Sequence, residues 1–211
     1  MIREVDRPVL VLGSTQRRTI VDDERADRAG VAVARRRSGG GAVLLAPGGQ
    51  VWADVWIPRD DPLWSDEPRR VAAAVGEWWL AALGDRTAAV HKGAAVAARG
   101  SDLVCFAGVG PGEVVVGGRK VVGLAQWRSR EGALVHGCAY RRWDPAPLIE
   151  LLAMDERARR LFGSTLAGAA VGLDTLGRPS AWGAAELAGV LPDGDAWDVH
   201  AVTAVPAAPL T

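Results

Sequence analysis

The chain of 211 residues has little cysteine, a single tyrosine and no excess of charge of either sign. Two cysteines allow one disulfide at most, so the sequence is not that of a disulfide-rich secreted domain. Lysine plus arginine and aspartate plus glutamate number 25 each, which excludes a global positive field for nucleic acid. No apolar run approaches the roughly 20 residues that span a bilayer, and the first residues lack the core of a secretion signal. We therefore expect a cytoplasmic protein without nucleic-acid or membrane partners.

Apolar residues and glycine are plentiful, and their pattern predicts the fold. With 49% apolar content we expect a single domain over residues 1–211 and no separate accessory domain. Apolar runs bounded by turns predict strands at 9–12, 31–34, 50–58, 113–116, 119–127 and 133–140. Capping residues predict helices at 68–83, from 144 to about 162, and at 180–190, and the tail at 205–211 is expected to be frayed or extended. This order indicates an α+β fold, a mainly antiparallel sheet with helices packed on it.

The first helix has clear end signals. Asp66 and Pro68 suit a helix N-terminus, and Gly84 suits a C-terminus. Its apolar stripe is expected to consist of Val71, Val75, Trp78 and Ala82.

Segment 35–43, with the sequence Arg-Arg-Arg-Ser-Gly-Gly-Gly-Ala-Val, has the composition of an anion site. Gly39, Gly40 and Gly41 let the backbone approach a ligand and direct amide groups at it, and the arginines add charge-assisted bonds. The spacing matches neither the phosphate loop of nucleotide triphosphatases nor the dinucleotide fingerprint. By itself, a glycine triplet after a run of charges is more often a plain loop.

Lys120 follows a predicted two-glycine hairpin turn at Gly117-Gly118. Gly123 and Ala125 alternate with bulkier residues, which leaves one face of this strand uncovered for a ligand. A lysine there can bind a phosphate or a developing negative charge, although a lone hairpin lysine is usually solvated. His136 lies on the next predicted strand, beside the strand of Lys120.

Four motifs in the same order resemble the lipoate-protein ligase and octanoyltransferase family, whose catalytic domain is related to that of biotin-protein ligases. They are Leu12-Gly13-Ser14-Thr15-Gln16, the segment 35–43, Gly118 to Gln126 (Gly-Arg-Lys-x-x-Gly-x-Ala-Gln) and His136-Gly137. The resemblance covers roughly residues 9–140. It implies the biotin/lipoate-protein-ligase-like catalytic fold.

The resemblance implies activation of lipoate or octanoate by ATP to an acyl-adenylate, with Mg²⁺. The acyl group then passes to a lysine of an apo lipoyl domain of a 2-oxoacid dehydrogenase E2 component, or of the glycine-cleavage H protein. Lys120 is the implied catalytic residue, and Asp102 is a candidate Mg²⁺ ligand or a strand cap. The implied acyl-adenylate contacts are Arg36, Ser38, Gly39, Gly40, Gly41, Ala42, Gly123, Ala125, His136 and Gly137.

The chain departs from the family pattern at several places. Leu44-Leu45-Ala46 stands where the family has Tyr-His-Asp, which removes two polar groups. The sequence begins almost at the first matching strand, so either the start is truncated or an upstream helix is lacking. The accessory domain of many ligases is not evident, which leaves room for a separate accessory subunit or for no such requirement.

Cys105 keeps a second enzymatic function open. The segment Ser101 to Phe106 resembles the Cys-Phe segment of octanoyltransferases, in which a cysteine takes the acyl group from octanoyl carrier protein without ATP. Lys120 would then help to deprotonate the thiol, because the thiolate is the nucleophile. A cysteine in an apolar strand is also typical of an ordinary core. A third alternative is a degenerate protein that binds an acyl group or a lipoyl domain without turnover.

Overall fold

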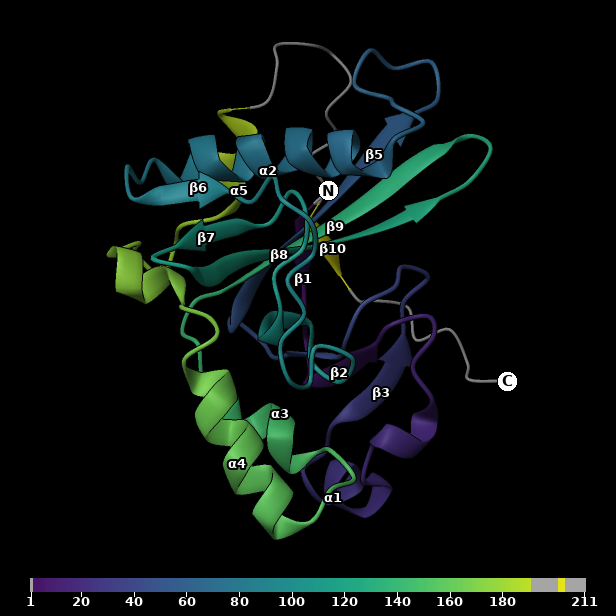
Figure 1. The fold of residues 1–211 in the computed structure, drawn as a ribbon, viewed down its shortest axis with the longest axis vertical. Helices are drawn as coiled ribbons and strands as arrows, with labels where there is room; N and C mark the ends of the chain where they lie inside the picture. Colours follow the sequence, from purple (N-terminus) through teal and green to yellow (C-terminus); the bar gives the residue numbers. More distant parts are fainter. Residues whose placement is uncertain (1, 191–200, 204–211) are drawn as a thin grey trace.

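The computed structural model describes residues 2–190 and 201–203, and its ribbon is drawn in Figure 1. The predicted α+β class is confirmed, because the strands form two sheets and the helices pack on their outer faces. The predicted tail at 205–211 lies outside the described residues.

The larger sheet of the described residues is antiparallel apart from one edge pair. In spatial order its strands are β10 (Ala201–Thr203), β1 (Ile2–Glu4), β5 (Gln50–Pro58), β9 (Gly132–Tyr140), β8 (Arg119–Arg128), β7 (Val114–Val116) and β6 (Ala88–Val90). Only β10 and β1 run parallel. Gly117 and Gly118 join β7 to β8 with φ of 56° and 77°, the left-handed values that a two-residue hairpin turn requires.

The smaller sheet has the order β3-β2-β4. Its strands are β2 (Val9–Leu12), β3 (Ala32–Arg35) and β4 (Val43–Leu45). As predicted, the runs near 9–12 and 31–34 belong to one sheet, where they pair in parallel. β3 and β4 bracket the arginine- and glycine-rich segment, so both ends of that segment are held by the same sheet.

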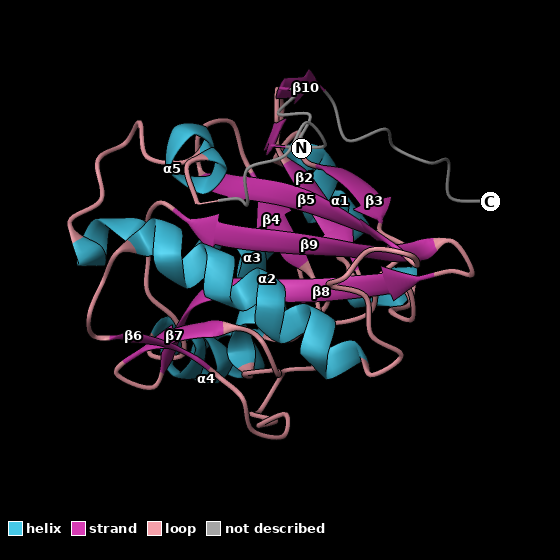
Figure 2. Ribbon diagram, turned by 90° about the horizontal axis from the view of Figure 1, so that it is seen from above, coloured by secondary structure: helices cyan, strands magenta, loops and turns pink. Residues whose placement is uncertain are grey.

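The elements stack in layers, and the two sheets face each other across an apolar core (Figures 1 and 2). Val9, Val11, Val43 and Leu45 of the smaller sheet pack against Trp52, Cys138 and Tyr140 of the larger one. On its far side the larger sheet is covered by α2 (Pro68–Leu83), which runs across it in Figure 2, and by α5 (Ala184–Ala188). The smaller sheet is covered by α1 (Asp23–Arg28), α3 (Ala146–Glu150) and α4 (Glu156–Ala167).

The helix α2 agrees with its predicted ends, but its buried face is rotated. Pro68 begins the helix, and Gly84 ends it in the left-handed conformation with φ of 56°. Val71 and Val75 are buried as predicted, whereas the other buried large side chains are Trp79 and Leu83 rather than Trp78 and Ala82. The N-cap is Glu67, without a side-chain capping bond, so the predicted cap at Asp66 is wrong.

The predicted helix from 144 to 162 is two helices, α3 and α4. The Asp155 side chain accepts a hydrogen bond from the Ala158 amide at 2.7 Å, and this cap starts α4 as a new helix. The helix predicted at 180–190 is the shorter α5. The described residues also form short 3₁₀ turns at Arg18–Ile20, Cys105–Ala107 and Leu173–Leu176.

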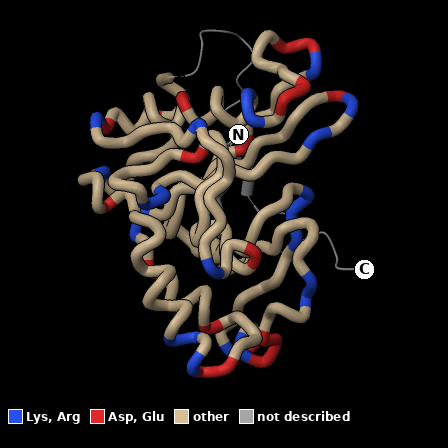
Figure 3. Tube along the Cα trace, in the orientation of Figure 1, with Lys and Arg blue, Asp and Glu red and all other residues tan. Residues whose placement is uncertain are grey.

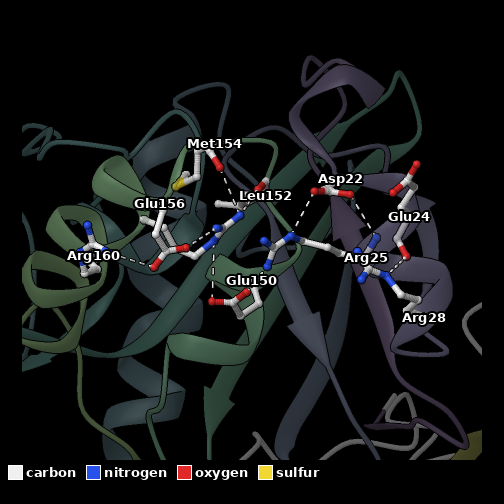
Figure 4. Close-up of polar contacts among 10 residues, drawn as sticks. Asp22, Glu24, Arg25, Arg28, Glu150, Leu152, Met154, Glu156 and Arg160 are labelled. Carbon is white, nitrogen blue, oxygen red and sulfur yellow. Dashed lines mark hydrogen bonds and ion pairs between the residues drawn. The ribbon is translucent and has the colours of Figure 1, made fainter.

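Charged side chains tie α1, α3 and α4 together at the lower end of the molecule (Figure 4). Arg25 pairs with Asp22 of its own helix start and with Glu150 at the end of α3. Arg159 of α4 is buried and donates to the carbonyl oxygens of Leu152 and Met154. Elsewhere Lys and Arg (blue) and Asp and Glu (red) are both spread over the molecule in Figure 3.

Candidate functional site

The glycine-rich segment is an ordered loop built around the guanidinium of Arg36. Arg36 is buried and donates to the carbonyl oxygens of Gly39 (2.7 Å), Gly41 (2.8 Å) and Val11 (3.3 Å). Gly40 has φ of 95°, which favours glycine and lets the chain turn around this cation. Burial lowers the pKa of Arg36 from its ordinary value. Arg36, which was predicted to contact a ligand, therefore also stabilises the conformation of the loop.

The far end of this loop joins the segment that carries Cys105. The Ala42 amide donates to the Leu103 carbonyl at 2.7 Å, and the Cys105 amide donates to the Ala42 carbonyl at 3.1 Å. A Cβ at Gly41 would stand 2.5 Å from the Val104 carbonyl carbon, so only glycine allows this approach. In contrast, a Cβ at Gly39 would meet no atom within 4 Å. The exposed Gly39 is thus not required by packing against the described residues.

The first motif fastens the same region from the other side. Gln16 is buried, accepts the Gly13 amide at 3.0 Å and donates to the carbonyl oxygens of Asp102 (2.7 Å) and Leu103 (3.0 Å). Arg35 donates to the carbonyl oxygens of Gly13 and Gln16. The motif at 12–16 therefore positions the segment of Cys105 rather than presenting polar groups itself.

Lys120 reaches this cluster from the large sheet and is almost completely buried. Its Nζ donates to the Cys105 carbonyl oxygen at 2.6 Å and pairs with Glu113 Oε2 at 2.7 Å. The two side chains are 2% and 4% exposed. Nζ also lies 5.4 Å from the centroid of the Phe106 ring. The lysine is thus fixed by three neighbours and is not the solvated hairpin residue of the alternative interpretation.

Glu113 was missed by the sequence analysis, although it organises this end of the site. Its Oε2 accepts the Gly110 amide at 2.6 Å, and its Oε1 accepts the Leu124 amide at 3.1 Å. A carboxylate that receives two amides and an ammonium is compensated within the fold, which is the condition for burying it. The only sequence signal was an acid at the start of the predicted strand 113–116, one strand before that of Lys120, and such an acid is usually exposed.

Two of the remaining predicted residues lie on the face of the large sheet that looks toward the smaller sheet. Gly123 lies opposite Cys138, and Ala125 lies opposite His136, so both small residues are on this face of β8, but at Gly123 the face is covered by Phe106 and not open as predicted. A Cβ at Gly123 would stand 3.1 Å from the Phe106 ring. Arg37 stacks on Trp127 further along the same strand, with 5.0 Å from the guanidinium carbon to the ring centroid. The loop at 36–41 consequently passes over this face.

Gly137 does not belong to this face. A Cβ there would stand 2.3 Å from Trp79 Nε1, which places Gly137 against α2 on the other side of the sheet. The side-chain alternation along β9 explains the difference, because neighbouring residues of a strand face opposite ways. The structure does not bring Gly137 together with the other predicted residues, and its glycine is explained by helix packing.

His136 is held by a carboxylate that the sequence analysis also missed. His136 Nδ1 lies 2.6 Å from Asp54 Oδ1, which also accepts a bond from Trp52 Nε1 at 2.8 Å. The Trp52 and His136 rings are tilted, with centroids 5.5 Å apart. Asp54 is 4% exposed and His136 12% exposed at the side chain. The alternation Trp52-x-Asp54 in a predicted strand was the available signal for this cluster.

The two cysteines lie in different surroundings and are both reduced. Cys138 is buried in the core between the sheets, where loss of solvation raises the pKa of its thiol far above the ordinary value. Cys105 is half-buried at the start of a 3₁₀ turn. The contact between Lys120 and Cys105 runs to the carbonyl oxygen of Cys105 and not to its sulfur.

Two buried polar atoms beside the glycine loop have no partner among the described residues. They are the hydroxyl oxygen of Ser38 and Nε of Arg36. Buried polar groups are normally hydrogen-bonded, and exceptions in a native fold call for a bound group or water. Donors at the base of a glycine loop fit an anionic or carbonyl-containing substrate such as an acyl phosphate.

A metal site is not evident within residues 2–190 and 201–203. No group of three or more His, Cys, Asp or Glu side chains there is arranged to hold a metal ion. Asp102 is exposed, and its carbonyl oxygen accepts a hydrogen bond from Gln16.

Residues 44–46, where the sequence departs from the family pattern, lie beside a surface cavity and away from Lys120. Leu45 is buried in the core between the sheets, and the Leu44 carbonyl accepts the Tyr140 hydroxyl at 3.0 Å. Leu44 and Ala46 line a cavity of about 630 Å³ whose other walls include Arg25, Arg28 and Pro147. Apart from this stretch, none of the predicted site residues lines it.

The comparisons with known proteins agree with this architecture. The family model of the lipoyl protein ligase A/B catalytic domain matches residues 2–165. The chain belongs to this family. A search of curated proteins gives no match. No helix in the described residues is long and apolar enough to cross a membrane.

Similar solved structures include three ligase-type folds. An archaeal bipartite lipoate protein ligase from Thermoplasma acidophilum, studied with its E2 lipoyl domain, has a TM-score of 0.62 at 18% identity, over 90% of this chain and 66% of that one. Protein Ta0514 of Thermoplasma acidophilum with bound lipoic acid has a TM-score of 0.61 at 17% identity, over 87% of this chain and 65% of that one. A lipoate-protein ligase A bound with ATP has a TM-score of 0.60 at 18% identity, over 87% of this chain and 66% of that one. The chain thus spans about two thirds of the length of these proteins.

Proposed function

We propose that this protein is a lipoate-protein ligase that activates lipoate or octanoate with ATP and transfers the acyl group to a lysine of a lipoyl domain. The membership of the catalytic-domain family is the observation that carries the proposal. The similar structures that hold lipoic acid and ATP support the choice of substrates. The structure studied together with an E2 lipoyl domain supports the choice of acceptor.

In the proposed reaction the glycine loop receives the acyl-adenylate. Backbone amides of Gly39 and Gly40 and the unpartnered Ser38 hydroxyl are the donors offered to it. Arg36 keeps the loop in shape through its bonds to Gly39 and Gly41. Gly123, which lies beneath Phe106, and Ala125 are the small residues of the strand beside which the acyl-adenylate is proposed to lie, with Ala42 at the end of the loop.

Lys120 is the proposed electrostatic centre of the site. A fixed cation stabilises the negative charge that develops on the phosphate and carbonyl oxygens, and this lowers the barrier more than it strengthens ground-state binding. The Glu113 pair holds the ammonium in place before substrate arrives. Because both groups are buried, a substrate anion there meets a preorganised and weakly solvated cation.

The partners follow from the reaction. The proposed acceptors are the apo lipoyl domain of a 2-oxoacid dehydrogenase E2 component and the glycine-cleavage H protein. Residues 1–211 are proposed to act as one catalytic domain. A separate accessory subunit is a further proposed partner, because the similar archaeal ligase is bipartite. Mg²⁺ is proposed to accompany ATP, held chiefly by phosphate oxygens and water, with Asp102 as the nearby acid.

Cys105 carries the alternative, an octanoyl carrier protein-dependent octanoyltransferase. Its partial exposure beside the Lys120 ammonium is the specific observation in favour. The thiol would take the octanoyl group as a thioester and pass it to the lipoyl domain without ATP. The bond of Lys120 to the backbone oxygen, rather than to sulfur, makes the ligase the first choice.

The two enzymatic functions are separated by intact mass of an apo lipoyl domain incubated with either of two donors. One tube holds ATP, Mg²⁺ and octanoate, and the other holds octanoyl carrier protein without ATP. The ligase predicts acylation in the first tube only, unchanged by Cys105→Ser. Acylation in the second tube only, abolished by Cys105→Ser, would establish the transferase. A protein that binds the lipoyl domain but acylates it in neither tube would be the degenerate form.

A further inference from the structure

Asp54 and His136 form a buried polar pair to which the proposed reaction, as described so far, assigns no step. The pair lies on the sheet face that carries Gly123 and Ala125, and Ala125, which is opposite His136, is next to Leu124, whose amide binds Glu113. Asp54 and His136 are direct neighbours across β5 and β9. Burying a carboxylate this completely requires bonded partners, and the fold supplies His136 and the indole of Trp52. Such an arrangement goes beyond what packing a β-sheet needs.

The contacts fix the tautomer and the direction of the imidazole. Because Asp54 Oδ1 is the partner of Nδ1, the proton lies on Nδ1 and the lone pair on Nε2. Nε2 lies on the edge of the ring away from this bond. On the other side of β9 the residue opposite His136 is Ala125, whose side chain is only a methyl group. The His136 side chain keeps 12% exposure against 4% for Asp54, so the imidazole is the more accessible member of the pair.

We propose that His136 is the proton acceptor for the incoming lysine of the acceptor domain, and that Asp54 and Trp52 are positioning residues for it. This inference rests on the proposed function. A lysine side chain arrives as an ammonium ion and must lose a proton before its nitrogen can attack an acyl carbonyl. An imidazole with a carboxylate behind it is suited to this transfer, because the carboxylate stabilises the imidazolium that forms.

The step balances as follows. His136 Nε2 takes one proton from the lysine ammonium, and the neutral amine attacks the carbonyl carbon of the acyl-adenylate. A C–N bond forms, the C–O bond to phosphate breaks, and AMP leaves with the electron pair. The second proton of the original ammonium is lost to solvent, as is the proton that His136 carries. Lys120 stays protonated throughout as the electrostatic partner of the leaving group.

The test compares two half-reactions in the full chain, with octanoate, ATP and an apo lipoyl domain. Activation is measured as octanoate-dependent ATP–pyrophosphate exchange without acceptor, and transfer is measured as acylation of the lipoyl domain. His136→Ala is expected to lower kcat of transfer about 100-fold, while the exchange rate and the acceptor KM change less than about threefold. Added imidazole is expected to restore transfer, because it replaces the missing base.

Further variants keep the result decisive. Asp54→Asn, which keeps the shape but reverses the hydrogen bond to Nδ1, is expected to lower kcat and to gain nothing from imidazole. His91→Gln changes a loop histidine bonded to Ala94 and serves as the control, with wild-type transfer. If His136→Ala does not fold, His136→Asn replaces it, because its amide can keep the bond to Asp54 without supplying a base.

Two outcomes would overturn the inference. One is a folded His136 variant that transfers within threefold of wild type, and the other is equal loss of exchange and transfer without rescue by imidazole. Failure of the wild-type protein to acylate the lipoyl domain at all is a different result, since it removes the proposed function itself.

Discussion

The ammonium of Lys120 and the carboxylate of Glu113 form a buried ion pair, with 2.7 Å between Nζ and Oε2. The pair explains how the fold tolerates a cation in a region with almost no solvent. Removing one charge of such a pair leaves the other buried without a partner, whereas replacing both charged groups with neutral ones is far less destabilising. The catalytic and structural roles of Lys120 can therefore be separated by experiment.

Lys120→Met should lower the free energy of unfolding by about 3–5 kcal/mol, because the Glu113 carboxylate stays buried without its cation. Adding Glu113→Gln should recover most of this stability, since the amide oxygen still accepts a backbone bond and carries no charge. Urea unfolding followed by circular dichroism measures both variants. If Lys120→Met alone were as stable as wild type, the ion pair would not be a buried one.

Arg36 and Arg37 offer a matched pair of neighbouring arginines. Arg36→Met should destabilise the protein by about 3 kcal/mol, because three carbonyl groups, two of them in buried hydrogen bonds, lose their donor. Arg37→Met removes an exposed cation stacked on Trp127 and should change stability by less than about 1 kcal/mol. Thermal melting compares them, and equal effects would refute the bracing role of Arg36.

Substitutions at Gly39 and Gly41 distinguish a glycine needed for ligand binding from a glycine needed for packing. Gly41→Ala should destabilise the loop by about 1–3 kcal/mol, since its Cβ would collide with the backbone of Val104 and Cys105. Gly39→Ala should leave the melting temperature unchanged, because the added methyl meets nothing within 4 Å. We nevertheless expect Gly39→Ala to weaken acyl-adenylate binding at least tenfold by isothermal titration with a non-hydrolysable octanoyl-adenylate analogue, as roughly 1.4 kcal/mol of lost contact gives. Unchanged binding would remove Gly39 from the proposed site.

The cysteines should differ in reactivity. Cys105 is half-buried, whereas Cys138 is enclosed and has its thiol pKa raised by burial, so the reactive thiolate is scarce at Cys138 over the whole neutral range. Iodoacetamide at pH 8 should label Cys105 in the folded protein and Cys138 only after unfolding. Peptide mass spectrometry over time reads both sites. Labelling of Cys138 at the same rate as Cys105 would contradict the described core.

The elements with local signals were predictable from the sequence. Pro68 and Gly84 fix the ends of α2, and the Gly117-Gly118 turn fixes the β7–β8 hairpin, because these residues act through backbone conformations of their own. The break between α3 and α4 had a local signal too, the capping side chain of Asp155. It was missed because the apolar pattern continues across the break.

Long-range partners were not predictable in this way. Glu113 and Asp54 are acids near or within strands, and a single sequence does not reveal which distant cation or imidazole will neutralise them. The dual position of Arg36 is similar, since its residue type suggests a ligand contact while its bonds to Val11 and Gly41 depend on the meeting of two strands and a loop. Motif order located the site, and the fold determined which motif residues support it from within.

The measurement that tests the central proposal most directly is the intact mass of an apo lipoyl domain after incubation with ATP, Mg²⁺, octanoate and this protein. The matched control is the Lys120→Met, Glu113→Gln double variant, first verified as folded. The proposed ligase predicts one octanoyl group on the domain with wild-type protein, dependent on ATP, and none with the double variant. An unmodified domain with the wild-type protein, or equal acylation by the double variant, would contradict it.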